Sequence, residues 1–186
     1  MNRVSLQEPA EVQNLAMPSF RLPDATSIME GALSQAMDSC ARRLNLEGPQ
    51  AALELLRRQD AAAQGYCHYH LAQQVAEALA TLDDNVQSVS MYEFDATPED
   101  RALGQRAEGL PIHLIVWVGR KTSAFKSLVT ALDRALVKDY AELIGPRRLG
   151  HVLDVQVIDD ADVDSRRGIA SLLTSLHNRP IRLWER

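Results

Sequence analysis

The feature that most constrains the fold is the almost continuous apolar run IHLIVWV at residues 112–118. A run of this length, bounded by turn residues, is typical of a central strand that is covered on both faces. Three further short segments rich in β-branched and aromatic residues predict strands at 86–94, 152–158 and 181–184. We therefore expect an α/β (α+β) fold with a mixed sheet of about four strands.

Apolar residues at helical spacing predict the remaining elements. The front of the chain indicates a helix over 24–46 and a long helical stretch over 50–82, which Gly65 would divide. The back indicates helices over 125–143, ended by Gly145, and over 162–176. We expect an irregular arm at 1–23, a helical region at 24–83 and an α/β region at 86–186, packed together as one compact unit.

Bulk properties exclude several classes of function. The 186 residues carry a net charge of −5, which disfavours nucleic-acid binding because phosphate contacts need clustered basic residues. Two cysteines are too few for a disulfide scaffold and suggest a reducing compartment. The start lacks the pattern of a signal peptide, and no apolar run is long enough to span a bilayer. We expect a cytoplasmic protein with no membrane partner.

A cluster of metal-ligating residue types lies in the helical region. Cys67 and His70 are three positions apart and would share one helix face. With a third ligand they could bind zinc, but two neighbouring ligands do not make a site, and paired Cys-x-x-Cys spacing is missing. The alternative is a buried cysteine packed beside aromatic and imidazole groups.

The segment that follows the apolar run joins a strand to a helix. Its five residues are a candidate anion-binding turn, because basic side chains stand beside backbone N–H groups at a helix start: Gly119, Arg120, Lys121, Thr122 and Ser123. A P-loop would need a further glycine five residues before Gly119, where Leu114 stands. The alternative is an ordinary capped turn.

Polar residues in or beside the strands form the main candidate site. His113 interrupts the apolar run, either as a general base or ligand or as a hydrogen-bonded structural histidine. Glu93, Asp95 and Asp154 could converge with it at one end of the sheet. For an enzyme, at least two of these four side chains must come within hydrogen-bond reach of each other.

The order of elements over residues 86–186 resembles a nucleotidyltransferase domain of the polymerase-β superfamily. The matching strands are VSMYEF, PIHLIVWV and LDVQVID. In that family a Gly-Ser turn follows the first strand, two carboxylates separated by one residue lie on the second, and a third carboxylate lies on a later strand. Together the three bind the metals that align a nucleotide.

The catalytic parts of that family are missing from this chain. Asp95-Ala96 stands where Gly-Ser belongs, and Pro111 and His113 stand where the paired carboxylates belong. Only Asp154 matches, and one acid cannot hold two Mg²⁺ ions. The resemblance therefore implies a degenerate member without catalysis, for which nucleotide and Mg²⁺ are the ligands to test.

Three functions follow from these observations. The first is a non-catalytic binding or interaction domain on a degenerate nucleotidyltransferase-like fold, self-associating through its helical half. The second is an enzyme with an unrecognised site near His113 and Asp154. The third is a structural subunit whose partner is another protein. The residues themselves predict no cofactor.

Overall fold

The computed structural model describes residues 22–92, 111–145, 150–175 and 179–186. Within these ranges the elements follow one another as α1 (Leu22–Arg43), α2 (Pro49–Arg57), α3 (Ala61–Leu82), β1 (Val86–Met91), β2 (Ile112–Val118), α5 (Ser123–Ile144), β3 (Leu153–Ile158), α6 (Asp160–Ser165), the 3₁₀ helix η1 (Gly168–Thr174) and β4 (Ile181–Glu185). The expected arm lies outside the described residues, except that its last two positions begin α1.

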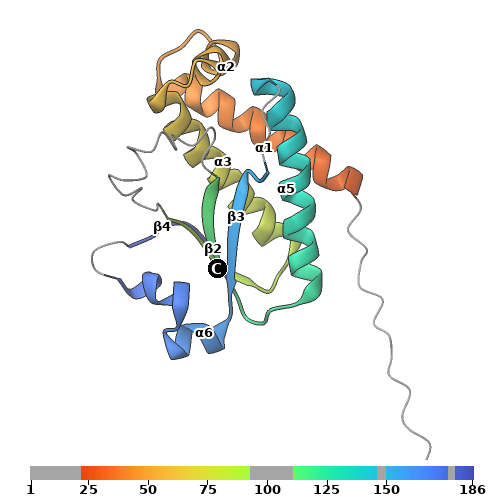
Figure 1. The fold of residues 1–186 in the computed structure, drawn as a ribbon, viewed down its shortest axis with the longest axis vertical. Helices are drawn as coiled ribbons and strands as arrows, with labels where there is room; N and C mark the ends of the chain where they lie inside the picture. The colour runs from red at the N-terminus through yellow and green to blue at the C-terminus, as the bar shows by residue number, and fades with distance from the viewer. Residues whose placement is uncertain (1–21, 93–110, 146–149, 176–178) are drawn as a thin grey trace, which may run out of the picture.

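The four strands form one mixed sheet in the order β3-β2-β1-β4 (Figure 1). Strands β2 and β3 are parallel, and β1 is antiparallel to both of its neighbours, β2 and β4. Helix α5 makes the crossover from β2 to β3, because two parallel strands cannot be joined by a tight turn. The predicted α+β class, with a helical front half on a mixed four-stranded sheet, is confirmed.

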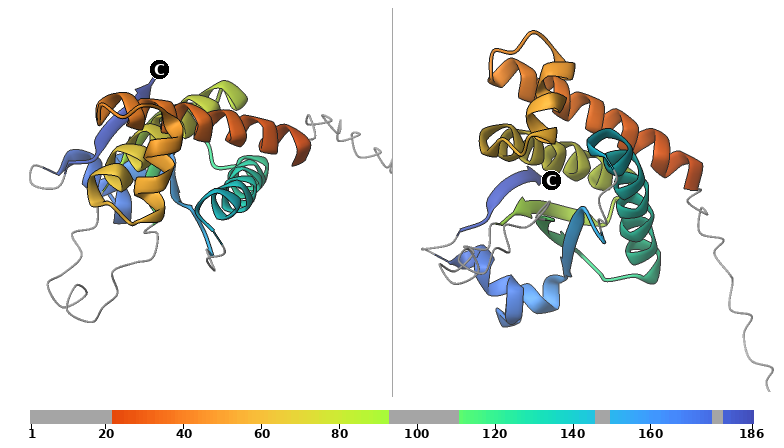
Figure 2. Two further views of the ribbon diagram at one scale, coloured as in Figure 1. Left: turned by 90° about the horizontal axis from the view of Figure 1, so that it is seen from above. Right: turned by 45° about the horizontal axis from the view of Figure 1, so that its top comes forward.

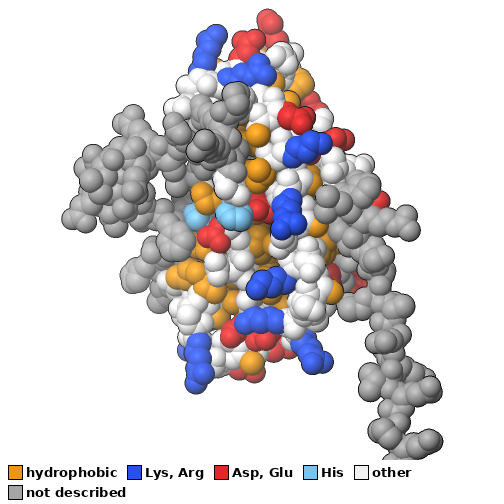
Figure 3. Space-filling view, turned by 45° about the vertical axis from the view of Figure 1, so that its right-hand side comes forward, with side chains coloured by type: hydrophobic (Ala, Val, Ile, Leu, Met, Phe, Trp, Pro, Cys, Tyr) orange, Lys and Arg blue, Asp and Glu red, His pale blue; other side chains and the backbone are white. Residues whose placement is uncertain are grey.

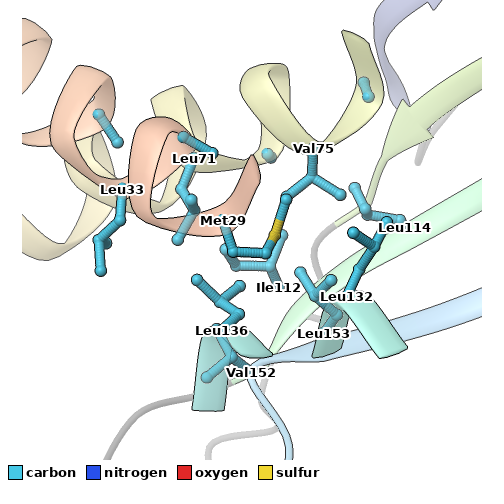
Figure 4. Packing of buried hydrophobic residues seen from close by; sticks show 14 of the residues in the cluster. Met29, Leu33, Leu71, Val75, Ile112, Leu114, Leu132, Leu136, Val152 and Leu153 are labelled. Carbon is cyan, nitrogen blue, oxygen red and sulfur yellow. The ribbon is translucent and has the colours of Figure 1, made fainter. Parts of the chain in front are cut away.

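A large hydrophobic core fills the space between one face of the sheet and helices α1, α3 and α5. Strand β2 directs alternate residues into it, among them Ile112 and Leu114, as the two-residue period of a strand requires. Figure 4 shows Met29 of α1, Val75 of α3 and Leu132 of α5 converging on these strand residues. The helical region and the sheet therefore share a single core.

The opposite face of the sheet carries a much smaller apolar cluster. Its buried members are Tyr92, Ile115, Ile158 and Ala170. Helix α6 and η1 lie on this side, across the sheet from α1 and α3 (Figure 2, right). The sheet is therefore covered unequally, with a thick helical layer on one face and a thin one on the other.

The long helical stretch divides at a different point from the one predicted. Gly65 lies within α3, and the break is at Gln59, whose φ of 62° ends α2 in the left-handed conformation. The Asp60 carboxylate then accepts a hydrogen bond from the Ala63 N–H at 2.9 Å and caps α3. An aspartate at the N-cap is a stronger boundary signal than a glycine that can sit inside a helix.

The helix predicted over 162–176 is also interrupted. Arg166 has a φ of 49° and ends α6, and η1 follows from Gly168. The acidic run before this break has a capping role: the Asp159 side chain accepts from the Asp162 N–H, and the Asp162 side chain accepts from the Asp159 N–H. This reciprocal capping box starts the helix two residues earlier than the apolar pattern indicates.

Candidate functional site

Two of the predicted site residues meet on the thinly covered face of the sheet. His113 on β2 and Asp154 on β3 are partners in the parallel register, so both side chains leave the sheet on the same side. The His113 Nδ1 lies 2.9 Å from the Asp154 Oδ2, which accepts its hydrogen bond. Histidine side chains lie next to acidic ones near the middle of the face drawn in Figure 3.

The second oxygen of Asp154 is engaged as well. The Gln156 Nε2, two residues along the same strand, donates a hydrogen bond to the Asp154 Oδ1 at 3.1 Å. The Asp154 side chain is 37% exposed and that of His113 is 17% exposed. A ligand could therefore reach this pair, but it would meet a carboxylate whose two oxygens already have donors.

Tyr92, which follows the last residue of β1, completes the cluster. Its ring lies 5.4 Å from the His113 ring between centroids, and its backbone N–H donates to the His113 carbonyl oxygen at 3.1 Å. Burial of the ring, and secondly the nearby Asp154 carboxylate, raise the pKa of Tyr92 to about 12. Both causes favour the neutral phenol, because the phenolate would lose its hydration and would place a second negative charge beside Asp154.

The other two nominated acids cannot be placed. Glu93 and Asp95 stand one and three positions after Tyr92 in the sequence, and both lie outside the described residues. Of the four candidates, the structure thus brings two within hydrogen-bond reach. Tyr92 was missed by sequence reasoning, and the available signal was its position next to Glu93 at the end of the predicted strand.

The turn proposed to bind an anion has internal partners for three of its donors. The Gly119 N–H donates to the Asn85 carbonyl oxygen at 2.9 Å, and the Arg120 N–H donates to the Asn85 side-chain oxygen at 3.1 Å. Thr122 caps α5 by accepting from the Phe125 N–H at 3.1 Å, and Lys121 forms an ion pair with Asp162. These bonds describe a capped turn, and anion binding there stays a prediction.

The pair nominated for zinc consists of a buried thiol and a half-buried imidazole. Burial, and secondly the nearby Cys40, raise the pKa of Cys67 to about 12, so the thiol keeps its proton, whereas zinc binds the thiolate. The His70 Nδ1 is hydrogen-bonded to the Gln73 Oε1 at 3.1 Å. In the described ranges, no three His, Cys, Asp or Glu side chains gather as metal ligands would.

Comparison with known proteins adds no relative: the chain matches no protein-family model, no curated protein and no solved structure. In the part of the chain that the structure describes, no helix is both long and apolar enough to cross a membrane. A histidine oriented by a carboxylate, beside a protonated phenol, can hold a ligand through hydrogen bonds or act as an oriented base.

Proposed function

We propose that this protein is a non-catalytic binding domain on a degenerate nucleotidyltransferase-like fold. The observation that carries the proposal is the hydrogen bond between His113 and Asp154. The resemblance places metal-binding carboxylates at both positions, and here one of the two is an imidazole.

The charges of His113 and Asp154 support ligand binding without metal-dependent nucleotidyl transfer. Carboxylates hold Mg²⁺ through their combined negative charge and free oxygen lone pairs. Asp154 is a single acid, and its oxygens accept from His113 and Gln156. A metal ion at Asp154 would therefore compete with two hydrogen-bond donors for one carboxylate.

The first experiment is a thermal-unfolding titration with ATP and GTP, each with and without Mg²⁺. We expect a nucleotide to raise the melting temperature by several degrees at about 100 times its Kd, to a similar extent with and without Mg²⁺. No nucleotide should be consumed. Turnover by the purified wild-type protein would contradict the proposal, and so would a complete absence of nucleotide binding.

Two variants locate the binding. Asp154→Asn should weaken the shift because the histidine loses its orienting carboxylate. Asp84→Asn removes one charge of the same type from a fully exposed position and should leave the shift unchanged. Equal effects of the two substitutions would show that only net charge matters, and the site would then lie elsewhere.

The same geometry supports a second candidate, an enzyme in which His113 is a general base oriented by Asp154. Two of the four nominated side chains meet the requirement of hydrogen-bond contact. This candidate predicts that His113→Gln abolishes turnover of a substrate but retains its binding. A binding domain has no turnover to lose, so one activity screen against nucleotides and their esters separates the two.

The third hypothesis, a structural subunit that binds through its helices, gains less support. Among the described residues, the exposed large apolar side chains are Leu82 and Ile181, and only Leu82 belongs to the helical region. A protein partner that needs a broad apolar patch would not find one on these helices. Gel filtration over a range of concentrations tests whether the chain associates with itself.

A further inference from the structure

A cavity of about 470 Å³ opens where α1, α2 and α5 meet, on the far side of the large core from the His113 site. The three helices come together at the top of the molecule in Figure 1. The lining combines apolar side chains, among them Leu33, Met37 and Leu53, with the acids Glu30, Asp139 and Glu142. A cavity of this size suits a small organic molecule.

Asp139 is the unusual residue in this lining. Its side chain lies on the core side of α5, and the residue is only 8% exposed. Its Oδ2 is shielded from solvent and has no hydrogen-bond partner among the described residues. A buried polar atom without a partner is rare in folded proteins, because it loses its bonds to water and gains nothing in exchange.

Asp133, six residues earlier on the same helix, shows how this chain satisfies a buried carboxylate. It is also 8% exposed. Its Oδ1 accepts from the Val152 and Leu153 N–H groups at 3.0 and 2.9 Å, and its Oδ2 lies 2.8 Å from the His151 Nδ1. Two equally buried acids on one helix therefore differ: Asp133 has three internal donors, and the Oδ2 of Asp139 has none within the described ranges.

The charges around Asp139 do not replace the missing donor. Burial, and secondly the Glu30 carboxylate on α1, raise the pKa of Asp139, and Glu142 acts in the same direction. Only the exposed Lys138 opposes them. No Lys or Arg is among the described residues that line the cavity, so its polar side carries an excess of negative charge.

The shape of the lining specifies the rest of the ligand. Leu33, Met37 and Leu53 are buried side chains that present an apolar wall to the cavity. The acids Glu30 and Asp139 come from different helices, α1 and α5, and both line the cavity. A ligand that fits has a cationic end with N–H donors and a short apolar body.

We propose that this cavity binds a protonated primary amine carried on a short apolar chain, with Asp139 and Glu30 receiving the ammonium group. The two oxygens of a carboxylate share one negative charge, so an ammonium group that contacts either oxygen of Asp139 neutralises that charge. The apolar wall takes the methylene groups, as it would for the stem of a lysine side chain. This site is independent of the nucleotide-binding proposal and shares no residue with it.

The test is calorimetric titration of the full-length protein with hexylamine and, as a neutral control of equal length, hexanol. We expect hexylamine to bind and hexanol to bind at least tenfold more weakly. Capped lysine, with both termini blocked as amides, distinguishes the source of the amine. Tighter binding of hexylamine indicates a free small molecule, and tighter binding of capped lysine indicates a side chain of a partner protein.

Matched variants identify the residues. Asp139→Asn and Glu30→Gln should each weaken hexylamine binding at least tenfold, whereas Asp38→Asn, the same charge change on α1 outside the cavity, should not weaken it. Unliganded Asp139→Asn should melt at or above the wild-type temperature, because an unpaired buried charge is removed, which shows that it folds. Equal affinity for hexanol, no affinity for hexylamine, or full affinity in both cavity variants would overturn the proposal.

Discussion

The two faces of the sheet have different compositions and different helical cover. The face toward α1, α3 and α5 is apolar throughout and belongs to a core that extends over both halves of the chain. The other face carries a small cluster beside the polar group formed by Tyr92, His113 and Asp154. Adjacent residues of the same strands therefore contribute to a large apolar core on one side and to a partly exposed polar cluster on the other.

Strand β2 contributes to both sides through adjacent residues. Leu114 and Ile115 are 0% and 1% exposed, yet they belong to different hydrophobic clusters. His113 lies on the thin side because residues two apart in a strand share a face, so it lies with Ile115. A polar residue in an apolar run is tolerated there because the helical cover on that side is incomplete.

The largest expected effect on stability comes from truncating Leu114 and Ile115, the adjacent residues of β2 that face opposite sides of the sheet. Leu114→Ala should lower the free energy of unfolding by about 4 kcal/mol, since the tightly packed helices around it cannot close the cavity. Ile115→Ala should lower it by about 2 kcal/mol, because half-buried neighbours such as Trp117 can move inward. Urea unfolding of both variants measures the difference. Equal losses would show that the two faces are packed equally well.

The next largest effect compares two carboxylates, Asp133 on the thickly covered side of the sheet and Asp154 on the thinly covered side. Asp133→Ala should lower the free energy of unfolding by about 2 to 3 kcal/mol, because two backbone N–H groups at the start of β3 lose their acceptor. Asp154→Ala should lower it by about 1 kcal/mol or less, since its partners can turn to water. The same urea experiment applies, and a larger loss for Asp154 would reverse the comparison.

A smaller effect should appear in alkali on the thin side. The pKa of Tyr92 is about 12 in the folded chain against an ordinary 10.0, so the unfolded chain loses this proton first. The stability that Tyr92 contributes is complete below pH 10 and is lost as pH rises toward 12. Melting temperatures of wild type and Tyr92→Phe should diverge in favour of the variant over this range, whereas parallel curves would contradict the assignment.

The Asp154→Asn variant checks the cause of that shift. Removing the carboxylate should lower the pKa of Tyr92, read from the phenolate absorbance, but should not return it to its ordinary value, because burial is the larger cause. An unchanged pKa would mean that Asp154 does not act on the phenol.

The smallest effect should appear in acid on the thick side. Burial between α3 and α5 lowers the pKa of His68, whose Nε2 lies 3.3 Å from the Tyr140 Oη. Below about pH 6.5 the unfolded chain takes up a proton that the folded chain resists, so the stability contributed by neutral His68 declines as pH falls. The slope of melting temperature against pH should be shallower in His68→Gln, and an identical slope would place the acid-sensitive group elsewhere.

Much of the fold could be predicted from local signals. The strand over 112–118 was predicted at its observed bounds, and the stop of α5 at Gly145 followed from the residue that ends it. The predictions failed at Gln59 and Arg166, where the chain turns through left-handed conformations without a glycine. Nothing in residue type alone marks those two positions, since the turns depend on the caps that follow or precede them.

The candidate site was predicted in part. His113 and Asp154 were nominated as polar residues in apolar strands, but they are 41 residues apart in the chain. Their contact depends on the parallel pairing of β2 with β3 and on the register that sets them opposite each other. Tyr92 and Asp139 looked like ordinary strand and helix residues, and only their surroundings distinguish them.

The sequence by itself determined which segments are helices and strands, because hydrophobic periodicity, caps and glycines act over a few residues. It also determined that one strand would be buried on both faces. Only the tertiary structure decided that helices cover one face thickly and the other thinly. The tertiary structure also decided that Asp133 has hydrogen-bond donors, whereas the Oδ2 of Asp139 has none among the described residues. Those outcomes depend on which distant backbone groups come within about 3 Å of a side chain, and local patterns carry no information about such distances.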